Sequence, residues 1–139
     1  MRVSAKVDYA LRATAELAAA QLDPARSGPL KGERLATAQQ IPLNFLENIL
    51  LELRRSGIVA SQRGAEGGYW LAKPAADVTV ADVIRAVEGP IATVRGARPE
   101  DVAYTGSATA LREVWIDLRT SMRGVLETTT LADLVERSG

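Results

Sequence analysis

Apolar side chains recur at three- and four-residue intervals in six segments of the chain, and this spacing predicts amphipathic helices. The segments run from about Ser4 to Gln21, Leu30 to Gln39, Pro42 to Arg55, Val80 to Glu88, Ser107 to Thr128 and Leu131 to Arg137. Two short runs between the third and fourth segments, Ile58–Gln62 and Tyr69–Ala72, are expected to be strands. The stretch from Ile91 to Gly106 has no clear period and is expected to be mostly irregular.

The ends of several helices carry residues that suit them. Ser4, Thr79 and Thr130 each precede a helix, where a side-chain oxygen can accept a backbone N–H. Pro42 stands at the first position of the third helix, where its missing N–H costs nothing. Gly57 follows that helix at the position where a left-handed residue is expected.

The segment from Leu35 to Leu71 has a specific order of elements. A short helix, a turn at Gln40 and Ile41, and a longer helix precede two strands joined by the glycine-rich tip 63–68. Helix-turn-helix followed by a β-wing is typical of proteins that lay one helix in a DNA major groove. The expected fold is therefore mainly α with a small β-wing: a winged helix-turn-helix domain joined to a long dimerisation helix.

The elements predict a division of the chain into three parts. We expect residues 1–75 to form the winged helix-turn-helix domain, with the helix at 79–88 packed on it, and residues 90–106 to form a connecting loop. Residues 107–139 would hold the dimerisation helix and a short C-terminal helix. The long helix carries an apolar stripe that could pack on its own domain or across a dimer axis. The stripe comprises Leu111, Val114, Trp115, Leu118, Met122, Val125 and Leu126.

Composition narrows the function further. The 139 residues include no cysteine and no histidine, which excludes thiol chemistry and Ser–His or Cys–His catalytic pairs and removes the preferred ligands of zinc and iron–sulfur clusters. Residues 1–74 carry a net charge of +3 and residues 75–139 a net charge of −3. A basic half joined to an acidic half suits a DNA-contacting module on a dimerisation and sensing module. No enzyme, metal or cofactor is expected.

No window of the sequence approaches the roughly 18 continuous apolar residues of a membrane span. Charges at Lys6, Asp8, Arg12 and Glu16 interrupt the first helix, so it does not resemble the core of a signal peptide. We expect a cytoplasmic protein with no membrane partner.

Candidate base contacts lie on the outward face of the third helix, which carries Asn44, Phe45, Glu47 and Asn48. Asparagine can bond adenine, glutamate can accept from cytosine, and an aromatic ring can lie against a thymine methyl. The alternative is a solvated helix face with Phe45 tucked into the core.

Candidate backbone contacts are the basic residues and glycines nearby. Arg54 lies in the last turn of the third helix, Arg63 opens the wing, and Gly64 lets the chain approach DNA closely. The alternatives are helix-dipole complementarity for Arg54 and a solvated turn for Arg63. Weaker phosphate candidates are Lys6, Arg2, Lys31, Arg34 and Arg55. The tip is not a nucleotide-binding loop, because no Gly-Lys-Ser/Thr and no helix follow it.

A candidate effector pocket lies between the long helix and the connecting loop, where Arg95, Tyr104 and Trp115 would meet a small-molecule or protein effector. Glu113 and Asp117 stand one turn apart on the long helix, but a solvated face is favoured over acid–base chemistry.

Four blocks in order resemble the Rrf2 family of bacterial transcription regulators: MRVSAKVDYALRA, IPLNFLENILLELRRSGIVASQRGAEGGYWLAKP, VTVADVIRAVEGP and ATALREVWIDLRTSMRGVLETTTLADLV. The resemblance covers nearly the whole chain and implies a two-fold dimer on a roughly palindromic operator near promoters. It implies base contacts from Pro42, Asn44, Phe45 and Glu47, a wing contact from Arg63 and a backbone contact from Arg54.

One departure from the family is informative. Many members carry three cysteines between the fourth helix and the dimerisation helix and bind an iron–sulfur cluster there. The matching stretch here, Ile91 to Ala110, has none, so cluster sensing is not carried over and the chain resembles the cluster-free branch. Some members of that branch regulate cysteine or sulfur metabolism, in part through a partner protein.

The leading hypothesis is a homodimeric regulator of transcription, a repressor, with two recognition helices roughly 34 Å apart on double-stranded DNA. The alternative is an interaction module whose wing and third helix dock a protein without direct DNA readout. An enzyme is the weakest hypothesis.

Overall fold

The computed structural model describes residues 1–26 and 28–139, and its elements follow the order that the hydrophobic pattern predicts. The helices are α1 (Ala5–Leu22), α2 (Gly32–Gln39), α3 (Leu43–Arg55), α4 (Val80–Glu88), α5 (Leu111–Leu126) and α6 (Leu131–Ser138), and the strands are β1 (Val59–Gln62) and β2 (Gly68–Leu71). Four short 3₁₀ turns, η1 to η4, lie at Pro24–Arg26, Ala75–Asp77, Pro99–Asp101 and Gly106–Ala108. The predicted fold class, mainly α with a small β-wing, is confirmed.

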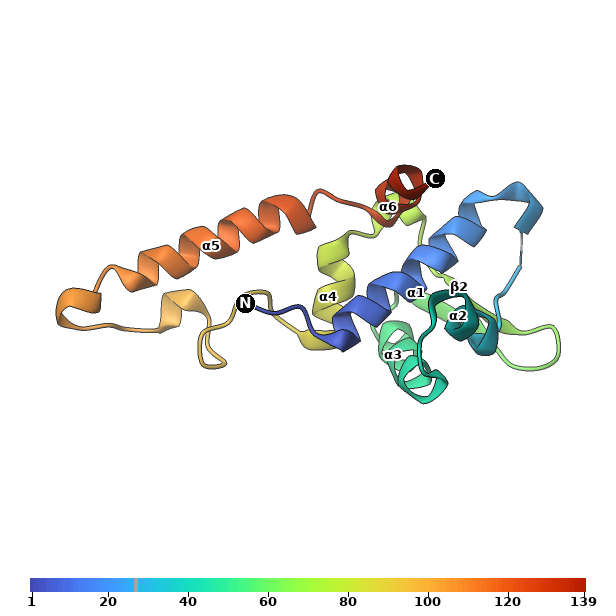
Figure 1. Cartoon of the computed structure of the whole chain (residues 1–139), viewed down its shortest axis with the longest axis horizontal. Helices are drawn as coiled ribbons and strands as arrows, with labels where there is room; N and C mark the ends of the chain where they lie inside the picture. The colour runs from blue at the N-terminus through green and yellow to red at the C-terminus, as the bar shows by residue number, and fades with distance from the viewer. Residues whose placement is uncertain (27) are drawn as a thin grey trace.

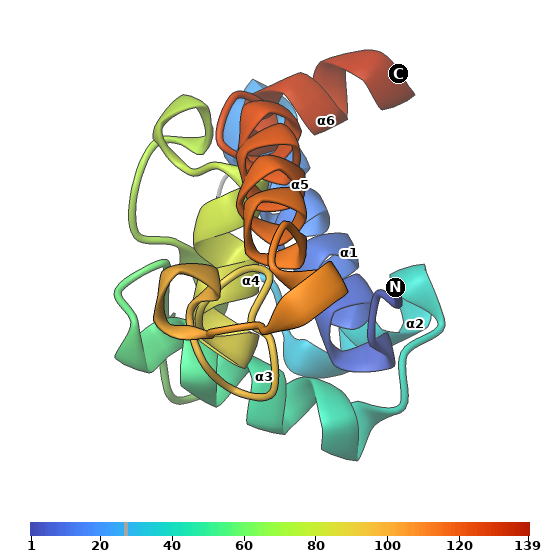
Figure 2. The same cartoon turned by 90° about the vertical axis from the view of Figure 1, so that its left-hand side faces the viewer.

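Helix α1 lies at the centre of the fold, with α3 and α6 on opposite sides of it (Figures 1 and 2). Its inner face is built from small and medium apolar residues, including the fully buried Ala10, Ala13 and Leu17. Alanine lets neighbouring helices approach closely, and α4 packs there as well. The predicted stripe of α3 closes the core with Leu46, Ile49, Leu50 and Leu53, all at most 1% exposed.

The predicted N-caps of three helices are confirmed. The hydroxyl of Ser4 accepts the backbone N–H of Val7 at 3.1 Å. Thr79 with Asp82, and Thr130 with Asp133, form reciprocal capping boxes. The backbone N–H of Thr130, donated to the carboxylate, lowers the pKa of Asp133.

The wing is an antiparallel hairpin in which Val59 pairs with Leu71 and Gln62 pairs with Gly68. A third segment joins it: Leu30 and Tyr69 exchange two backbone hydrogen bonds of 2.9 and 2.8 Å. The prediction that the second helix begins at Leu30 is therefore wrong by two residues, because Leu30 is held as a bridge to β2 and the helix starts at Gly32.

Helix α5 projects from the body at the end opposite the wing (Figure 1). It begins at Leu111 rather than at the predicted Ser107, because residues 106–108 form the separate turn η4. The stretch 91–106 is mostly irregular, as predicted, and contains η3 and a small bridge between Val94 and Ala97.

The C-terminal helix α6 returns to the body. Leu131 is fully buried in the core that α1 shares with α3. The backbone N–H of Leu131 donates to Val78, and that of Val80 donates to Thr129, both at 2.9 Å. These two hydrogen bonds tie the chain just after the C-terminal end of α5 to the body beside α4.

Among the described residues, no helix combines the length and the apolar character that crossing a membrane would require.

Candidate nucleic-acid interface

The turn between α2 and α3 is tight because Gln40 adopts a left-handed conformation, with φ of 53°. The backbone N–H of Ile41 then donates to the carbonyl of Ala36 at 2.9 Å. The Ile41 side chain is buried and anchors the turn to the core. These contacts fix the direction in which α3 leaves the turn, so its outer face is presented in a defined orientation.

The outer face of α3 is open along its first turns, where Asn44, Phe45, Glu47 and Asn48 are all exposed. The Phe45 side chain is 60% exposed, so the alternative that places it in the core is wrong. Its ring stands edge-on to Tyr9 of α1 with centroids 6.3 Å apart, and the guanidinium of Arg12 lies 4.8 Å from the centre of the Tyr9 ring. A large aromatic side chain is thus supported on an otherwise polar surface.

Tyr9 and Arg12 were not among the residues singled out from the sequence. Their three-residue spacing on α1 places them on one face of the helix. That this face supports Phe45 depends on the packing of α1 against α3, which no local pattern reveals.

A groove of about 560 Å³ lies between α3 and the wing. Glu47 and Asn48 line it from α3, Lys31 from the start of α2, and Gln62 and Arg63 from the wing. Most of these side chains are polar and exposed, so the groove suits a hydrated, charged polymer better than an apolar ligand.

The wing tip depends on glycine at three positions, and at Gly67 an added Cβ would collide with the backbone carbonyl of Gln62. At Gly68, φ is +149° and an added Cβ would lie 2.6 Å from the carbonyl oxygen of Leu30. At Gly64, φ is +103°, with open space around the position of a Cβ. The carbonyl of Gly64 accepts a hydrogen bond of 2.6 Å from Lys31 Nζ, which ties the tip to the start of α2.

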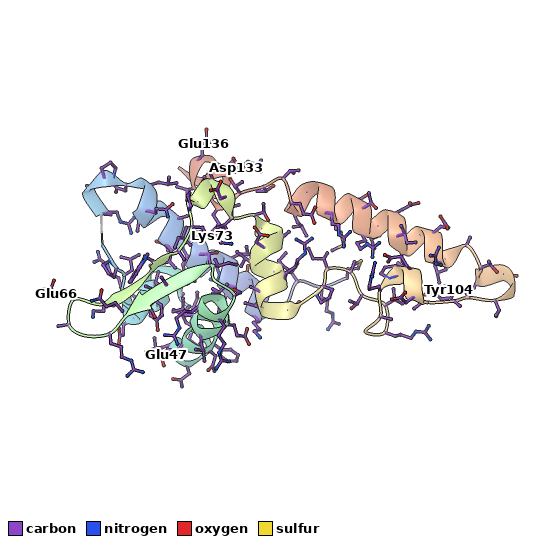
Figure 3. The ribbon with its side chains drawn as sticks, turned by 180° about the vertical axis from the view of Figure 1, so that it is seen from behind. Glu47, Glu66, Lys73, Tyr104, Asp133 and Glu136 are labelled. Atoms are coloured by element: carbon purple, nitrogen blue, oxygen red, sulfur yellow. The ribbon has the colours of Figure 1, made fainter. Side chains whose placement is uncertain are left out.

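Arg54 and Arg63 both line the groove. Arg54 Nη1 donates to Ser61 Oγ at 3.1 Å and so links the end of α3 to β1. Arg63 is exposed. Glu66 also stands exposed, at the end of the hairpin (Figure 3), and gives the tip a negative charge.

Lys6 is held by an ion pair within the protein. Its Nζ lies 2.8 Å from a carboxylate oxygen of Glu52 on α3, and the pair links α1 to α3. Lys6 would have to leave Glu52 to reach a phosphate. The other candidates, Arg2, Arg34, Pro42 and Arg55, are exposed.

The chain itself covers the apolar stripe of α5 only in part. Within α5, all of which the structure describes, Arg119 is the one buried residue. Val114 and Val125 are 51% and 64% exposed, and the remaining members of the stripe, Leu111, Trp115, Leu118, Met122 and Leu126, are half-buried. A helix that exposes two valines beside half-buried leucines and a half-buried tryptophan is typical of one that packs on a partner.

Arg119 fastens the connecting loop to α5. The residue is 8% exposed, and its Nη1 lies 2.5 Å from Glu100 Oε1 in η3. The hydrogen bond from Arg119 is the main reason that the pKa of Glu100 falls to about 2. The Nε of Arg112 adds a hydrogen bond of 3.3 Å to the backbone carbonyl of Glu100.

We predict that Glu100→Gln loosens this loop and lowers the melting temperature at pH 7. Because the folded-state pKa of Glu100 lies below its ordinary value of 4.5, the carboxylate stabilises the native state above pH 4.5, and this contribution is lost as pH falls toward 2. Thermal unfolding of both proteins between pH 7 and pH 2 should show the difference narrowing over that window. A difference that is the same at all pH values would contradict the assignment.

The residues of the candidate effector pocket are only partly together. The indole N–H of Trp115 donates to the hydroxyl of Tyr104 at 2.9 Å, beside α5 (Figure 3). Arg95 is exposed, with φ of 51°. The indole N–H of Trp115 is therefore already paired with Tyr104, and a ligand that used this N–H would have to replace that hydrogen bond.

The family resemblance raises the question of an iron–sulfur cluster, and the residues present do not fit one. These 139 residues contain neither a thiol nor an imidazole to ligate iron. Over residues 1–26 and 28–139, no three carboxylates lie close enough together to hold a metal ion in their place.

Comparison with known proteins connects this geometry to a family. The family model Rrf2, described as an iron-dependent transcriptional regulator, matches residues 3–137. The chain is 50% identical over 134 residues to Rv1287 of Mycobacterium tuberculosis, whose name describes it as a candidate HTH-type transcriptional regulator; the match covers 96% of this chain and 81% of the relative.

Solved structures agree with the sequence matches. CymR of Bacillus subtilis, described as the global cysteine regulator of that organism, superposes with a TM-score of 0.81 at 34% identity, over 100% of this chain and 99% of the other. IscR of T. potens superposes with a TM-score of 0.78 at 32% identity, over 100% and 89%. The chain is a DNA-binding transcriptional regulator of the Rrf2 family.

Proposed function

We propose that this regulator acts as a homodimer that reads a two-fold symmetric operator. The observation that carries the proposal is the partly exposed apolar stripe of α5. Two copies of the stripe meeting about a two-fold axis would bury it on both chains, because a two-fold interface uses the same surface twice.

A second surface supports the same pairing. An apolar groove of about 640 Å³ runs between the N-terminal arm, α4 and α5, and includes Val3, Ile84, Met122 and Val125. Met1 and Val3 are 86% and 75% exposed. Because this groove adjoins the stripe, one interface could cover both.

The proposed readout assigns roles to the two sides of the groove beside α3. Asn44, Phe45 and Glu47 contact base edges, with Pro42 and Asn48 beside them. Arg54, Arg63, Lys6 and the backbone at Gly64 approach the phosphates, and Lys31 holds the wing tip in place through Gly64. The contacts on α3 would set sequence preference, and the basic contacts would supply affinity that falls with salt.

We expect Glu47→Ala to relax base preference by about tenfold at one position in each half-site while leaving affinity for random DNA nearly unchanged. The measurement is binding to an operator and to its single-base variants. Glu136→Ala, which removes an equally exposed carboxylate on α6, is the matched control. Unchanged preference in Glu47→Ala would contradict the assigned base contact.

We expect Arg63→Ala to weaken binding about tenfold for every sequence tested and to reduce the number of counterions released by about one per half-site, which is about two per dimer. Titrations at several salt concentrations give both numbers. Arg137→Ala removes the same charge from α6 and should leave the slope as it is. Equal effects of the two substitutions would show that net charge, and not wing contact, is responsible.

We also propose that the protein represses transcription, and we propose which genes it regulates. A dimer seated on a promoter blocks access to it, so we propose repression, carried out in the cytoplasm and without an iron–sulfur cluster. Kinship with CymR makes genes of sulfur or cysteine metabolism the proposed targets. The effector, a small molecule or a partner protein, would act on the loop 91–106 where Tyr104 meets Trp115.

The first test is fluorescence anisotropy on the DNA upstream of its own gene, against scrambled DNA, at two salt concentrations. Specific binding that weakens steeply with salt, at two protein chains per site, supports the proposal. Equal weak binding to both DNAs would contradict this operator. No binding at low salt, with a stable protein complex instead, would favour the interaction module.

A further inference from the structure

A third cavity, between the wing and the end of α1, has no part in the proposed DNA contacts. It has a volume of about 500 Å³ and lies between the C-terminal end of α1, the loop that follows it and the hairpin. Leu17 and Gln21 line it from α1, Asp23 and Pro24 from the loop, and Trp70 from β2. Its volume falls in the range of pockets that hold small organic ligands.

The walls of this cavity are preformed. The Gln21 amide donates to the carbonyl of Lys73 at 2.9 Å and accepts the backbone N–H of Ala75 at 2.7 Å. The register Ala60–Trp70 and Gln62–Gly68 places Trp70 and Gln62 on one face of the hairpin, and both line the cavity. A ligand would therefore enter a site whose two sides are already fixed.

The chemistry of the lining points to one class of ligand. Leu17 and Ala20 of α1 and Trp70 of β2 give the cavity an apolar and aromatic lining, and Trp70 is 36% exposed. Among the described residues that line the cavity, Asp23 is the one with a charged side chain. One of its carboxylate oxygens, Oδ1, accepts the backbone N–H of Ala25 at 2.9 Å, which holds the carboxylate at this end of the cavity.

We propose that this cavity binds a small aromatic cation, with the ring against Trp70 and the ammonium or amidinium group near Asp23. Aromatic rings attract both other rings and cations, and a carboxylate in the same site favours positive over negative ligands. Such a ligand would touch α1 and the hairpin at once. Its effect on DNA binding rests on the proposed function, because the same hairpin carries Arg63.

The chain contains two tryptophans, Trp70 and Trp115, which gives the test an internal control. The experiment is a titration of the full chain with 2-phenylethylammonium, followed through the two indole N–H signals in ¹H–¹⁵N spectra, with Trp70→Phe identifying each signal. We expect the Trp70 signal to shift and saturate while the Trp115 signal, next to Tyr104, stays in place. Two signals that move together, or neither moving, would overturn the proposal.

Charge selectivity is tested with 3-phenylpropionate, which has a similar ring and chain but the opposite charge. We expect it to bind at least fivefold more weakly than the amine, and Asp23→Asn, which keeps Oδ1 as an acceptor for Ala25, to abolish that preference. An anion that binds as well as the amine would overturn the assignment.

A separate experiment measures the affinity for operator DNA with and without the amine. The amine at saturation is expected to change DNA affinity at least threefold in the native chain and not in Asp23→Asn. A saturable Trp70 shift with unchanged DNA affinity would keep the site and reject its regulatory role. Absence of DNA binding, with or without amine, would count against the proposed operator and not against the site.

Discussion

Replacing Val114 and Val125 by glutamate is expected to turn the dimer into a monomer and to weaken operator binding by about 100-fold or more. Both side chains are more than half exposed in the single chain, so the substitutions should leave its fold intact. In a dimer they would bury four carboxylates against apolar surface, which is strongly unfavourable. Each half-site would then be bound separately, without the gain that linking two sites provides.

Light scattering gives the mass directly, since one chain is 14.8 kDa. Thr120→Glu is the matched control, because Thr120 is exposed and lies on the opposite side of α5 from the stripe. We expect this variant to remain a dimer with native affinity. A native chain that is itself monomeric on its operator, or a Thr120→Glu variant that dissociates equally, would contradict the proposed interface.

Local sequence patterns were sufficient for most of the fold. Three caps, the stripe of α3 and the left-handed Gly57 after it are short-range features, and each follows from spacing or from one residue's conformational preference. The order of elements then limits the arrangement to a winged helix-turn-helix. The exposed face of α3 follows as well, since it is the complement of the stripe.

The contacts between distant segments could not be predicted in this way. From the sequence alone, Lys6 looks like an ordinary charged residue on the polar face of α1. In the fold, its Nζ donates a hydrogen bond to the carboxylate of Glu52, which is 46 positions away in the sequence. Lys31 reaches Gly64, and Glu100 reaches Arg119, for the same reason: folding brings together segments whose separate patterns contain no sign of each other. These are also the contacts that fix the wing and the connecting loop.

Leu30 shows how such a contact changes a local prediction. Its position fits the helical period of the residues after it. Its backbone N–H and carbonyl pair with Tyr69 instead, so they make no hydrogen bonds within α2. The wing gains a third extended segment from this bridge. The cost is that the chain at Gly68 must pass very close to Leu30, which makes the residue type at position 68 unusually restricted.

Gly68→Ala is therefore expected to destabilise the protein by about 3 kcal/mol, since the substitution combines backbone strain with a steric clash. An added Cβ would lie 2.6 Å from the carbonyl oxygen of Leu30, and φ is +149°. For a chain of this size the melting temperature should fall by roughly 10 °C. The clash falls on the bridge between Leu30 and β2, so the wing should also lose its fixed position and DNA affinity should drop.

Gly64→Ala separates the two causes. That position has φ of +103° but no atom within 4 Å of an added Cβ, so only the backbone strain remains, worth about 1 kcal/mol. Denaturant titrations of both variants, together with hydrogen exchange at the amides of Leu30 and Tyr69, distinguish strain from clash. Equal destabilisation of the two variants, with both amides still protected, would show that the bridge does not depend on glycine at position 68.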